Sequence, residues 1–424
     1  MLSLQNRAPA RGRAHEAPRR LIVIGTGVIG IATAYAFARR GWSVTVVDQA
    51  EGPALGASFA NGAQLSYAYT DALAHPDLLR RLPQLTIGLD PSFKVRGLLD
   101  PDFAPWALQF LRNCTWTRFS DHTAAGLHLA LESSAALESL MERHPFEFHH
   151  AVPGKLHIFR SRPAFETARR VVDIKRRHGG RQAVLSWGEA VAIEPALRAA
   201  GEVVGVIHTP DDAVGDPFRF STELLKVLTQ QYGVTARFGF RVVRLEAQEG
   251  RAWVANAAGD VLRADLLAIC AGVDAPQLLR KLGLSAPVWP MKGYSFTAAV
   301  GPEAPRLSVT DSARKVVFCR LADQIRVAGL AELGAQSTAV DRRRAAQLID
   351  LARSVLPAAA HYDAVTSVWA GLRPMSPSSL PIINRPRPEL VLNVGHGMLG
   401  WTYAMGAGER AAALSASSRL ERIP

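Results

Sequence analysis

The sequence predicts an α/β protein with two domains: one built on a parallel sheet wrapped by helices, and a second, discontinuous α+β domain built on a mostly antiparallel sheet. Three patterns support this fold class. An apolar strand, a glycine-rich turn and a helix follow one another over residues 21–40, buried-strand patterns return near residues 234 and 264, and short alternating strands fill most of residues 286–370. A chain of 424 residues is long enough for two domains.

The composition is that of an ordinary globular protein, with 48% hydrophobic and 20% charged residues. The three cysteines are odd in number and far apart, which argues against a disulfide framework or a zinc ribbon and favours a reducing compartment. The net charge is +12, and five arginines against one glutamate place +4 of it in residues 1–20, which we expect to form a disordered basic extension. No nucleic-acid-binding motif is present, so we expect no nucleic-acid partner.

Residues 21–38 carry no charge and have the length of a membrane span or a signal-peptide core. Glycines at positions 25, 27 and 30 divide them into a short β-like run and a helical run, and Arg39-Arg40-Gly41 marks the helix end. The order is therefore strand 21–24, glycine turn, helix 31–40 and strand 43–47. This β-α-β unit indicates dinucleotide binding rather than a membrane segment.

Each residue of the turn Gly25-Thr-Gly27-Val-Ile-Gly30 has a physical task. Gly25 permits the tight turn, Gly27 lets the backbone approach a pyrophosphate, and Gly30 lets the helix pack closely on the strand. The backbone N–H groups around Val28 and Ile29 lie at the helix N-terminus, where free donors and the positive end of the helix dipole favour phosphates. The motif predicts that the phosphates of the cofactor lie here.

Asp48 ends the second strand about twenty residues on, where its carboxylate can accept hydrogen bonds from ribose hydroxyls and disfavours a 2′-phosphate. The next loop, residues 56–66, is rich in small and amide residues. We expect Ser58, Asn61, Gly62 and Gln64 to lie along the diphosphate and the edge of a flavin. A polar loop that merely caps a helix is the alternative explanation.

The remaining elements fit a second domain that leaves the cofactor scaffold and returns twice. The patterns predict a strand at 154–161 and helices at 163–177 and 217–232. They also predict a cofactor-sheet strand at 234–238, a meander over 242–263 and a buried strand at 264–272 that ends in glycine. Further along, strands are predicted at 289–298, 316–320, 325–329 and 365–369, with one helix at 342–355.

Four further motifs give the chain a family resemblance. They are Leu-Arg-Asn-Cys at 111–114, Pro-Met-Lys-Gly-Tyr-Ser at 290–295, Trp-Ala-Gly-Leu-Arg-Pro-Met at 369–375, and Asn-Val-Gly-His-Gly-Met-Leu-Gly-Trp-Thr at 393–402. With the opening glycine turn and residues 58–64, they resemble the D-amino acid dehydrogenases of the small-subunit type, which belong to the FAD-dependent D-amino acid oxidase superfamily. The resemblance runs from about residue 20 to about residue 412. This family often has Pro-x-Asp-Gly-x-Pro where this chain has Pro-Ser-Ser-Leu-Pro at 377–381, which leaves the substrate range open.

The resemblance implies an FAD cofactor and oxidative deamination of D-amino acids to 2-oxo acids and ammonia, by hydride transfer from Cα to flavin N5. It implies a Rossmann-type FAD-binding domain formed by residues 21–65, 210–285 and 371–424, and a substrate domain formed by residues 66–209 and 286–370. Within the first domain, Val242 is expected at the adenine end and Gly272 near the diphosphate. Electrons are expected to pass to a respiratory quinone or another non-oxygen acceptor.

Three residues are candidates for the chemistry. Arg373 can bind a substrate carboxylate through two parallel hydrogen bonds, and Tyr294 can add its hydroxyl to the same group. His396 is a weaker candidate for an acid–base group. The start of the last helix is expected to stabilise the reduced flavin through its dipole; it comprises Gly397, Met398, Gly400, Trp401 and Thr402. A structural arginine, an aromatic filling the sheet and a structural histidine are the alternatives, and no histidine has the spacing of a metal ligand.

Two other functions remain open from the sequence. One is oxidation of a cyclic imino acid or an N-methyl amino acid, suggested by the altered loop at 377–381. The other is a flavin-binding sensor or assembly component without turnover. We expect a cytoplasmic protein. Residues 102–119 are rich in Trp and Phe with neighbouring arginines and show no clean helical or strand period, which suits peripheral contact with the inner face of the membrane, a pocket-covering loop or a contact between subunits.

Overall fold

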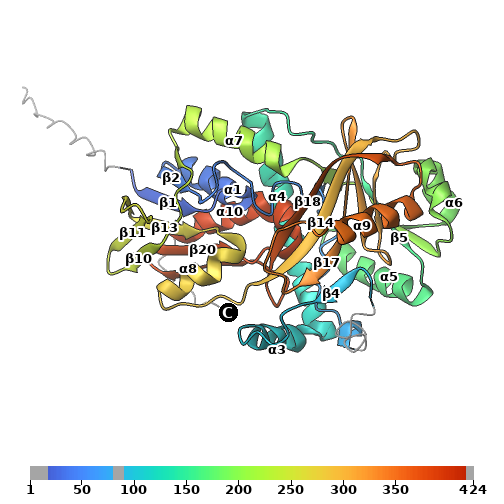
Figure 1. Ribbon diagram of the computed structural model, residues 1–424, viewed down its shortest axis with the longest axis horizontal. Helices are drawn as coiled ribbons and strands as arrows, with labels where there is room; N and C mark the ends of the chain where they lie inside the picture. The colour runs from blue at the N-terminus through green and yellow to red at the C-terminus, as the bar shows by residue number, and fades with distance from the viewer. Residues whose placement is uncertain (1–17, 80–89, 417–424) are drawn as a thin grey trace, which may run out of the picture.

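The computed structural model describes residues 18–79 and 90–416, and Figure 1 shows two sheets that lie side by side along its long axis. The first sheet has six strands in the order β19-β20-β13-β1-β2-β9. Its central strands pair in parallel, and only β19 runs antiparallel to its neighbour. The strands are β1 Arg20–Ile24, β2 Ser43–Val47, β9 Thr235–Arg237, β13 Leu266–Ile269, β19 Ile382–Arg387 and β20 Leu390–Val394.

Both faces of this sheet are covered, which is why residues 21–24 of β1 and all of β13 are apolar. Leu21 and Val23 pack in one core with four helices, and Ile22 and Ile24 pack in another core on the opposite face. The helices of the first face are α1 Val28–Ala38, α4 Trp116–Arg143, α7 Pro217–Tyr232 and α10 Gly400–Ala416. The opposite face carries α8 Ala275–Lys281 and an antiparallel sheet of β10 Arg244–Gln248, β11 Arg251–Ala255 and β12 Val261–Ala264.

The second sheet has nine strands, in the order β18-β14-β17-β16-β15-β5-β7-β6, with β4 paired to β17. Most of its pairs are antiparallel, and α9 Arg342–Val355 packs into its core. The strands are β4 Phe93–Val95, β5 Lys155–Phe159, β6 Ala183–Leu185, β7 Gly205–Thr209, β14 Trp289–Val300, β15 Ser308–Asp311, β16 Val316–Leu321, β17 Gln324–Leu333 and β18 Ala360–Met375. Smaller elements are β3 Gln64–Leu65 paired with β8 Ala213–Val214, α5 Arg162–Arg177, α6 Trp187–Ile193, and the 3₁₀ turns η1 Pro195–Ala200, η2 Gly272–Asp274 and η3 Gly397–Leu399. The fold class expected from the sequence is confirmed.

The chain crosses between the two sheets at places that differ from the expected domain limits. The expected limit at residue 371 falls inside β18, which runs on to Met375. Helix α4 lies within the range assigned to the substrate domain, yet its Leu129, Leu137 and Leu140 belong to the core under the parallel sheet. Of the expected extension at 1–20, Arg20 is the first residue of β1, and residues 1–17 lie outside the described residues.

The expectation that residues 102–119 have no regular period was wrong. They form α3 Phe103–Asn113 and the first turn of α4. Phe103, Trp106 and Phe110 are spaced i, i+3 and i+7 and are buried in one cluster with Trp289. The period was hidden because Leu108 and Leu111, which are equally apolar, point to solvent on the other side of the helix.

Candidate active site

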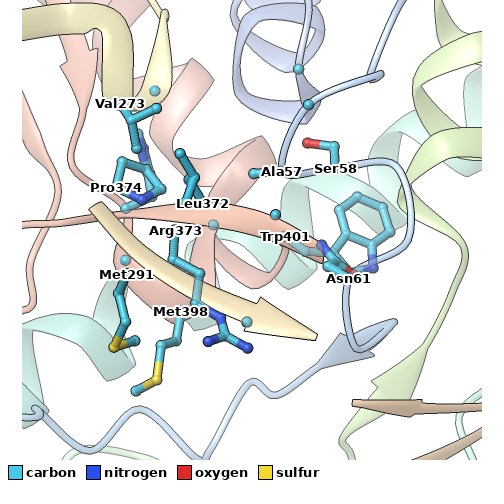
Figure 2. Close-up of a pocket in the computed structure, with 18 of the residues that line it drawn as sticks. Ala57, Ser58, Asn61, Val273, Met291, Leu372, Arg373, Pro374, Met398 and Trp401 are labelled. Carbon is cyan, nitrogen blue, oxygen red and sulfur yellow. The ribbon is translucent and has the colours of Figure 1, made fainter. Parts of the chain in front are cut away.

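One elongated cavity of about 870 Å³ lies between the two domains. Its lining includes Ile24, Val47 and Cys270, which lie at the carboxyl ends of β1, β2 and β13, the edge at which α/β folds bind their ligands. From there it extends across the large sheet to Arg373 on β18. Figure 2 shows part of this pocket, with Ser58 and Asn61 on one side and Arg373 on the other.

The glycine turn has the geometry of a diphosphate site. Gly25 has φ +101°, and a Cβ there would lie 2.6 Å from the carbonyl oxygen of Cys270. A Cβ on Gly30 would overlap the carbonyl oxygen of Gly25. At Gly27, by contrast, a Cβ would meet only the Ser58 hydroxyl at 3.4 Å, so its open face turns toward the cavity that it lines. The residues present therefore fit the diphosphate of FAD at the N-terminus of α1.

Asp48 is held rigidly at the same end of the cavity. One carboxylate oxygen accepts hydrogen bonds from Thr26 N at 2.6 Å and Thr26 Oγ1 at 2.7 Å, and the other accepts one from Ala50 N at 2.9 Å. Because each carboxylate oxygen can accept two bonds, an oxygen remains able to accept a ribose hydroxyl. Val242 and Gly272 line the cavity, and so does Arg241, which was not among the residues expected from the sequence.

Most residues expected to bind the cofactor line the cavity, but Gly30 and Thr402 do not. Gly30 acts through close packing of α1. Thr402 is buried, and its hydroxyl oxygen accepts a hydrogen bond from Ser66 N at 2.9 Å, so it fixes the neighbouring segment. Those that line it are Gly25, Gly27, Val28, Ile29, Asp48, Ser58, Asn61, Gly62, Gln64, Val242, Gly272, Gly397, Met398, Gly400 and Trp401.

The side chains of the loop at 56–66 are mostly engaged with the protein itself. Ser58 Oγ accepts from Val28 N at 3.1 Å, and Asn61 Oδ1 accepts from Ala63 N at 2.9 Å. The Gln64 amide accepts from Lys155 Nζ at 2.9 Å and donates to Ser308 Oγ at 2.5 Å. The loop is thereby held in a fixed conformation, and Gln64 faces the large sheet rather than presenting a free amide to the cavity.

Arg373 is a cation without a carboxylate partner among residues 18–79 and 90–416. Its side chain points into the pocket from β18 (Figure 2), and its one hydrogen bond runs from Nη1 to the carbonyl oxygen of Leu330 at 3.4 Å. Partial burial in the cavity wall lowers the pKa of Arg373 to about 10, so it stays charged at neutral pH. A partly buried guanidinium that lacks a counterion is well suited to bind an anion that enters the cavity.

Gly293, which the sequence analysis did not identify, makes room for this guanidinium. It lies on β14 two residues after Met291, which pairs with Arg373 across the strands, and a Cβ on Gly293 would overlap the guanidinium group. The only feature of the sequence that pointed to Gly293 was its place in the Lys-Gly-Tyr motif. Its meaning depends on which residue lies opposite, and the sequence does not give the strand register.

Replacing Gly293 with alanine is expected to lower kcat/KM for the amino acid substrate by about tenfold to a hundredfold, because the flexible arginine is displaced while the backbone stays in place. The FAD content and the melting temperature should remain close to those of the wild type. Gly188→Ala is the matched control, since a Cβ there meets nothing within 4 Å. Steady-state kinetics on both variants test this, and equal kcat/KM for Gly293→Ala and wild type would contradict the role of Gly293.

Tyr294 lines the cavity, but its ring belongs to the core with Phe296 and Leu348 of α9. Burial, together with the nearby carboxylates of Glu332 and Asp341, raises the pKa of Tyr294 to about 12. The Lys292 ammonium lies 5.1 Å from its ring centroid. These contacts match the alternative stated for Tyr294, an aromatic that fills the sheet, and nothing among them brings its hydroxyl to Arg373.

His396 is brought to the cavity by a bridge to Met375 at the end of β18. Burial lowers the pKa of His396 to about 3, so the ring is neutral near pH 7 and carries no ready proton. Its Nε2 is buried without a hydrogen-bond partner among the described residues. Such an orphan beside a cavity is the kind of atom that a bound cofactor satisfies, and an acid–base role has no electrostatic support.

A parallel sheet with a glycine turn, joined to a second sheet across one cavity, defines a dinucleotide-dependent enzyme of the two-domain flavoprotein class. The family model "FAD dependent oxidoreductase" matches residues 20–414, and the chain belongs to that family. The resemblance seen in the sequence is thus confirmed, and with it the FAD cofactor.

Within this family, the chain is similar to proteins that are named D-amino acid dehydrogenases. A D-amino acid dehydrogenase of Paramagnetospirillum magneticum is 38% identical over 394 residues, which are 92% of this chain and 93% of that protein. D-amino acid dehydrogenase 2 of Ralstonia nicotianae is 38% identical over 91% of this chain and 94% of its own. Among solved structures, L-proline dehydrogenase from P. horikoshii has a TM-score of 0.74 at 17% identity, covering 96% of this chain and 95% of its own. Glycine oxidase from Geobacillus kaustophilus has a TM-score of 0.72 at 19% identity, covering 95% and 96%. These two structures show the shared fold.

Proposed function

We propose that this chain catalyses the FAD-dependent oxidative deamination of D-amino acids. The observation that carries the proposal is the Arg373 guanidinium, which is partly buried, lacks a carboxylate partner in the described structure and faces the cavity. The relatives that are named D-amino acid dehydrogenases support the same substrate class. The net reaction converts a D-amino acid, water and an oxidised acceptor into a 2-oxo acid, ammonia and the reduced acceptor.

One group of cavity residues would hold the cofactor, and another would orient the substrate. Gly25, Gly27 and the N-terminus of α1 would hold the diphosphate of FAD, and Asp48 a ribose. When bound, FAD supplies the acceptor for the hydride that leaves the substrate Cα. Arg373 would bind the substrate carboxylate through two parallel hydrogen bonds and so set the direction of Cα. The turn η3 leads into α10, and residues 397–401 line the cavity, so the positive dipole end of α10 would face the region where negative charge develops on reduction.

The decisive experiment is anaerobic mixing of the purified flavoprotein with single amino acids while the yellow flavin absorbance is followed. D-amino acids with free amines are expected to bleach the flavin, and their L-enantiomers are not. If only cyclic imino acids or N-methyl amino acids bleach the flavin, the protein oxidises those compounds and not D-amino acids. The altered loop at residues 377–381 suggested this alternative. Absence of bleaching by any of these compounds would leave a flavin-binding protein without turnover.

The second part of the proposal concerns the electron acceptor. We propose that α3 docks on the anionic inner face of the cytoplasmic membrane and that electrons pass to a quinone there. No helix in the described part of the chain is long and apolar enough to cross a membrane. On α3, Leu108 and Leu111 are exposed beside Arg112, and Leu99 in the preceding loop is 99% exposed. Figure 1 shows α3 at the outer edge of the molecule. Exposed leucines with a neighbouring cation suit an interface.

Flotation with anionic vesicles tests this docking. The wild type is expected to float at low salt and to be released at high salt, because screening weakens the arginine contacts. Leu108→Asp with Leu111→Asp should stay with the soluble fraction, and Leu131→Asp, an exposed leucine on α4, should float like the wild type. Trp106 is unsuitable as a probe, since it is 3% exposed and its Nε1 donates to the carbonyl oxygen of Met375. A wild-type protein that stays soluble at low salt would refute the membrane proposal alone.

A further inference from the structure

A buried lysine of the large sheet supports the loop segment 64–66, which lines the cavity. Lys155 on β5 is 2% exposed and itself lines the cavity. Its Nζ donates to Gln64 Oε1 and to Ser66 Oγ, each at 2.9 Å, and lies 4.7 Å from the ring centroid of Tyr69. A single ammonium group therefore holds two residues of the segment that runs along the proposed flavin site.

Segment 64–66 and the residues that flank it are also fixed at three other points. Ser66 N donates to Thr402 Oγ1 in the first turn of α10 at 2.9 Å. Ser295 Oγ of β14 donates to the carbonyl oxygen of Ala60 at 2.5 Å, and Ala68 N donates to Asp212 Oδ1 at 3.0 Å. Lys155 is the cationic member of this set. Segment 64–66 thus contacts both the Lys155 ammonium group and the first turn of α10.

The charges around Lys155 form an ordered arrangement rather than a random cluster. Burial lowers the pKa of Lys155 to about 8, with Asp212 as the largest opposing influence. Asp212 does not line the cavity, and burial raises its pKa to about 6, so at neutral pH the pair places its positive member on the cavity side. The other ionic pair nearby is Lys175 with Asp71 at 2.7 Å. His157 stacks on Tyr69 at 3.7 Å and is neutral, because burial lowers its pKa far below 6.5.

A lysine at this place needs a reason, because burial of an ammonium group is costly and an apolar side chain of similar length would fill the same space. We propose that Lys155 is a positioning residue for the flavin: it fixes residues 64–66 along the cofactor and, through its charge on the cavity side, favours the reduced form of the flavin. The inference rests on the FAD-binding part of the proposed function and is independent of which amine is oxidised.

The test is the midpoint potential of the flavin in the purified holoprotein, measured by equilibration with a reference dye and no amino acid present. Lys155→Met is expected to make flavin reduction about tenfold less favourable, which is about 30 mV for a two-electron couple. That is the order expected for one unit charge roughly 10 Å away at an effective dielectric constant of about 20. Lys155→Arg keeps the charge and should stay within about threefold of the wild type.

The matched control removes a neighbouring ion pair without changing the net charge. Arg326→Met combined with Asp216→Asn removes a buried ion pair, joined at 3.1 Å, of which neither member lines the cavity, and should leave the potential within about threefold of the wild type. An unchanged potential in Lys155→Met would overturn the inference, as would an equal shift in the control. If Lys155→Met does not fold, Lys155→Gln removes the charge with a polar side chain. Its midpoint potential is then compared with those of the wild type and the control in the same way. A wild-type protein that binds no FAD would instead refute the proposed function.

Discussion

Replacing Arg373 with lysine is expected to lower kcat/KM for D-amino acids by about 30- to 1000-fold, or about 2–4 kcal/mol of transition-state binding. Lysine keeps the positive charge but offers one ammonium in place of the planar fork that holds both carboxylate oxygens. The guanidinium is positioned by the open space over Gly293 and by one long hydrogen bond to Leu330, so a substrate carboxylate would be its main partner. A shorter side chain would also fail to reach the same point.

The FAD content of Arg373→Lys should match the wild type, because the diphosphate site lies at the other end of the cavity. Arg353→Lys is a suitable control, since Arg353 is 45% exposed and pairs with Asp363 on the surface. Steady-state kinetics with a dye acceptor, together with the absorbance ratio of flavin to protein, separate the two effects. Wild-type kinetics for Arg373→Lys would assign the residue a structural role.

Gly27→Ala is expected to weaken FAD binding by about tenfold to a hundredfold or more while the apoprotein remains folded. The new Cβ would meet only the Ser58 hydroxyl, so the protein accommodates it, but the methyl group occupies the open side that the diphosphate needs. Each lost hydrogen bond to a charged phosphate costs about 1.5–3 kcal/mol.

Gly25→Ala provides the contrast, because its φ of +101° and its contact with Cys270 make the substitution disruptive to the backbone itself. This variant is expected to lose thermal stability even without FAD, whereas Gly27→Ala apoprotein should melt near the wild-type apoprotein. Fluorescence titration of the apoproteins with FAD and their thermal melts provide the two readings. Gly27→Ala with wild-type FAD affinity would show that the cofactor lies elsewhere.

Features encoded by neighbouring residues could be predicted from the sequence, and features that depend on tertiary pairing could not. The glycine turn, Asp48 and the strands around them are set by local spacing, which explains why these elements appear where the sequence indicates. Gly293 and Lys155 take their meaning from strand register and from which loop packs above the sheet. Helix α3 was not predicted because its exposed leucines hide the periodic pattern of its buried residues. Helix α4 was not placed correctly because its apolar residues pack against the parallel sheet of the other domain.

The order of the strands in the parallel sheet also constrains how the chain matures. Leu21 of β1 pairs with Leu266 of β13, and Leu267 of β13 pairs with Leu390 of β20. During synthesis, β1 and β2 can pair with each other early, but their outer neighbours β13 and β9 follow about 245 and 190 residues later, and the sheet closes only after β20 has left the ribosome. Contacts of such long sequence separation form slowly and leave apolar edges uncovered in the meantime. A nascent chain that ends before residue 394 therefore lacks both a strand of this sheet and residues 396–401 of the cavity lining.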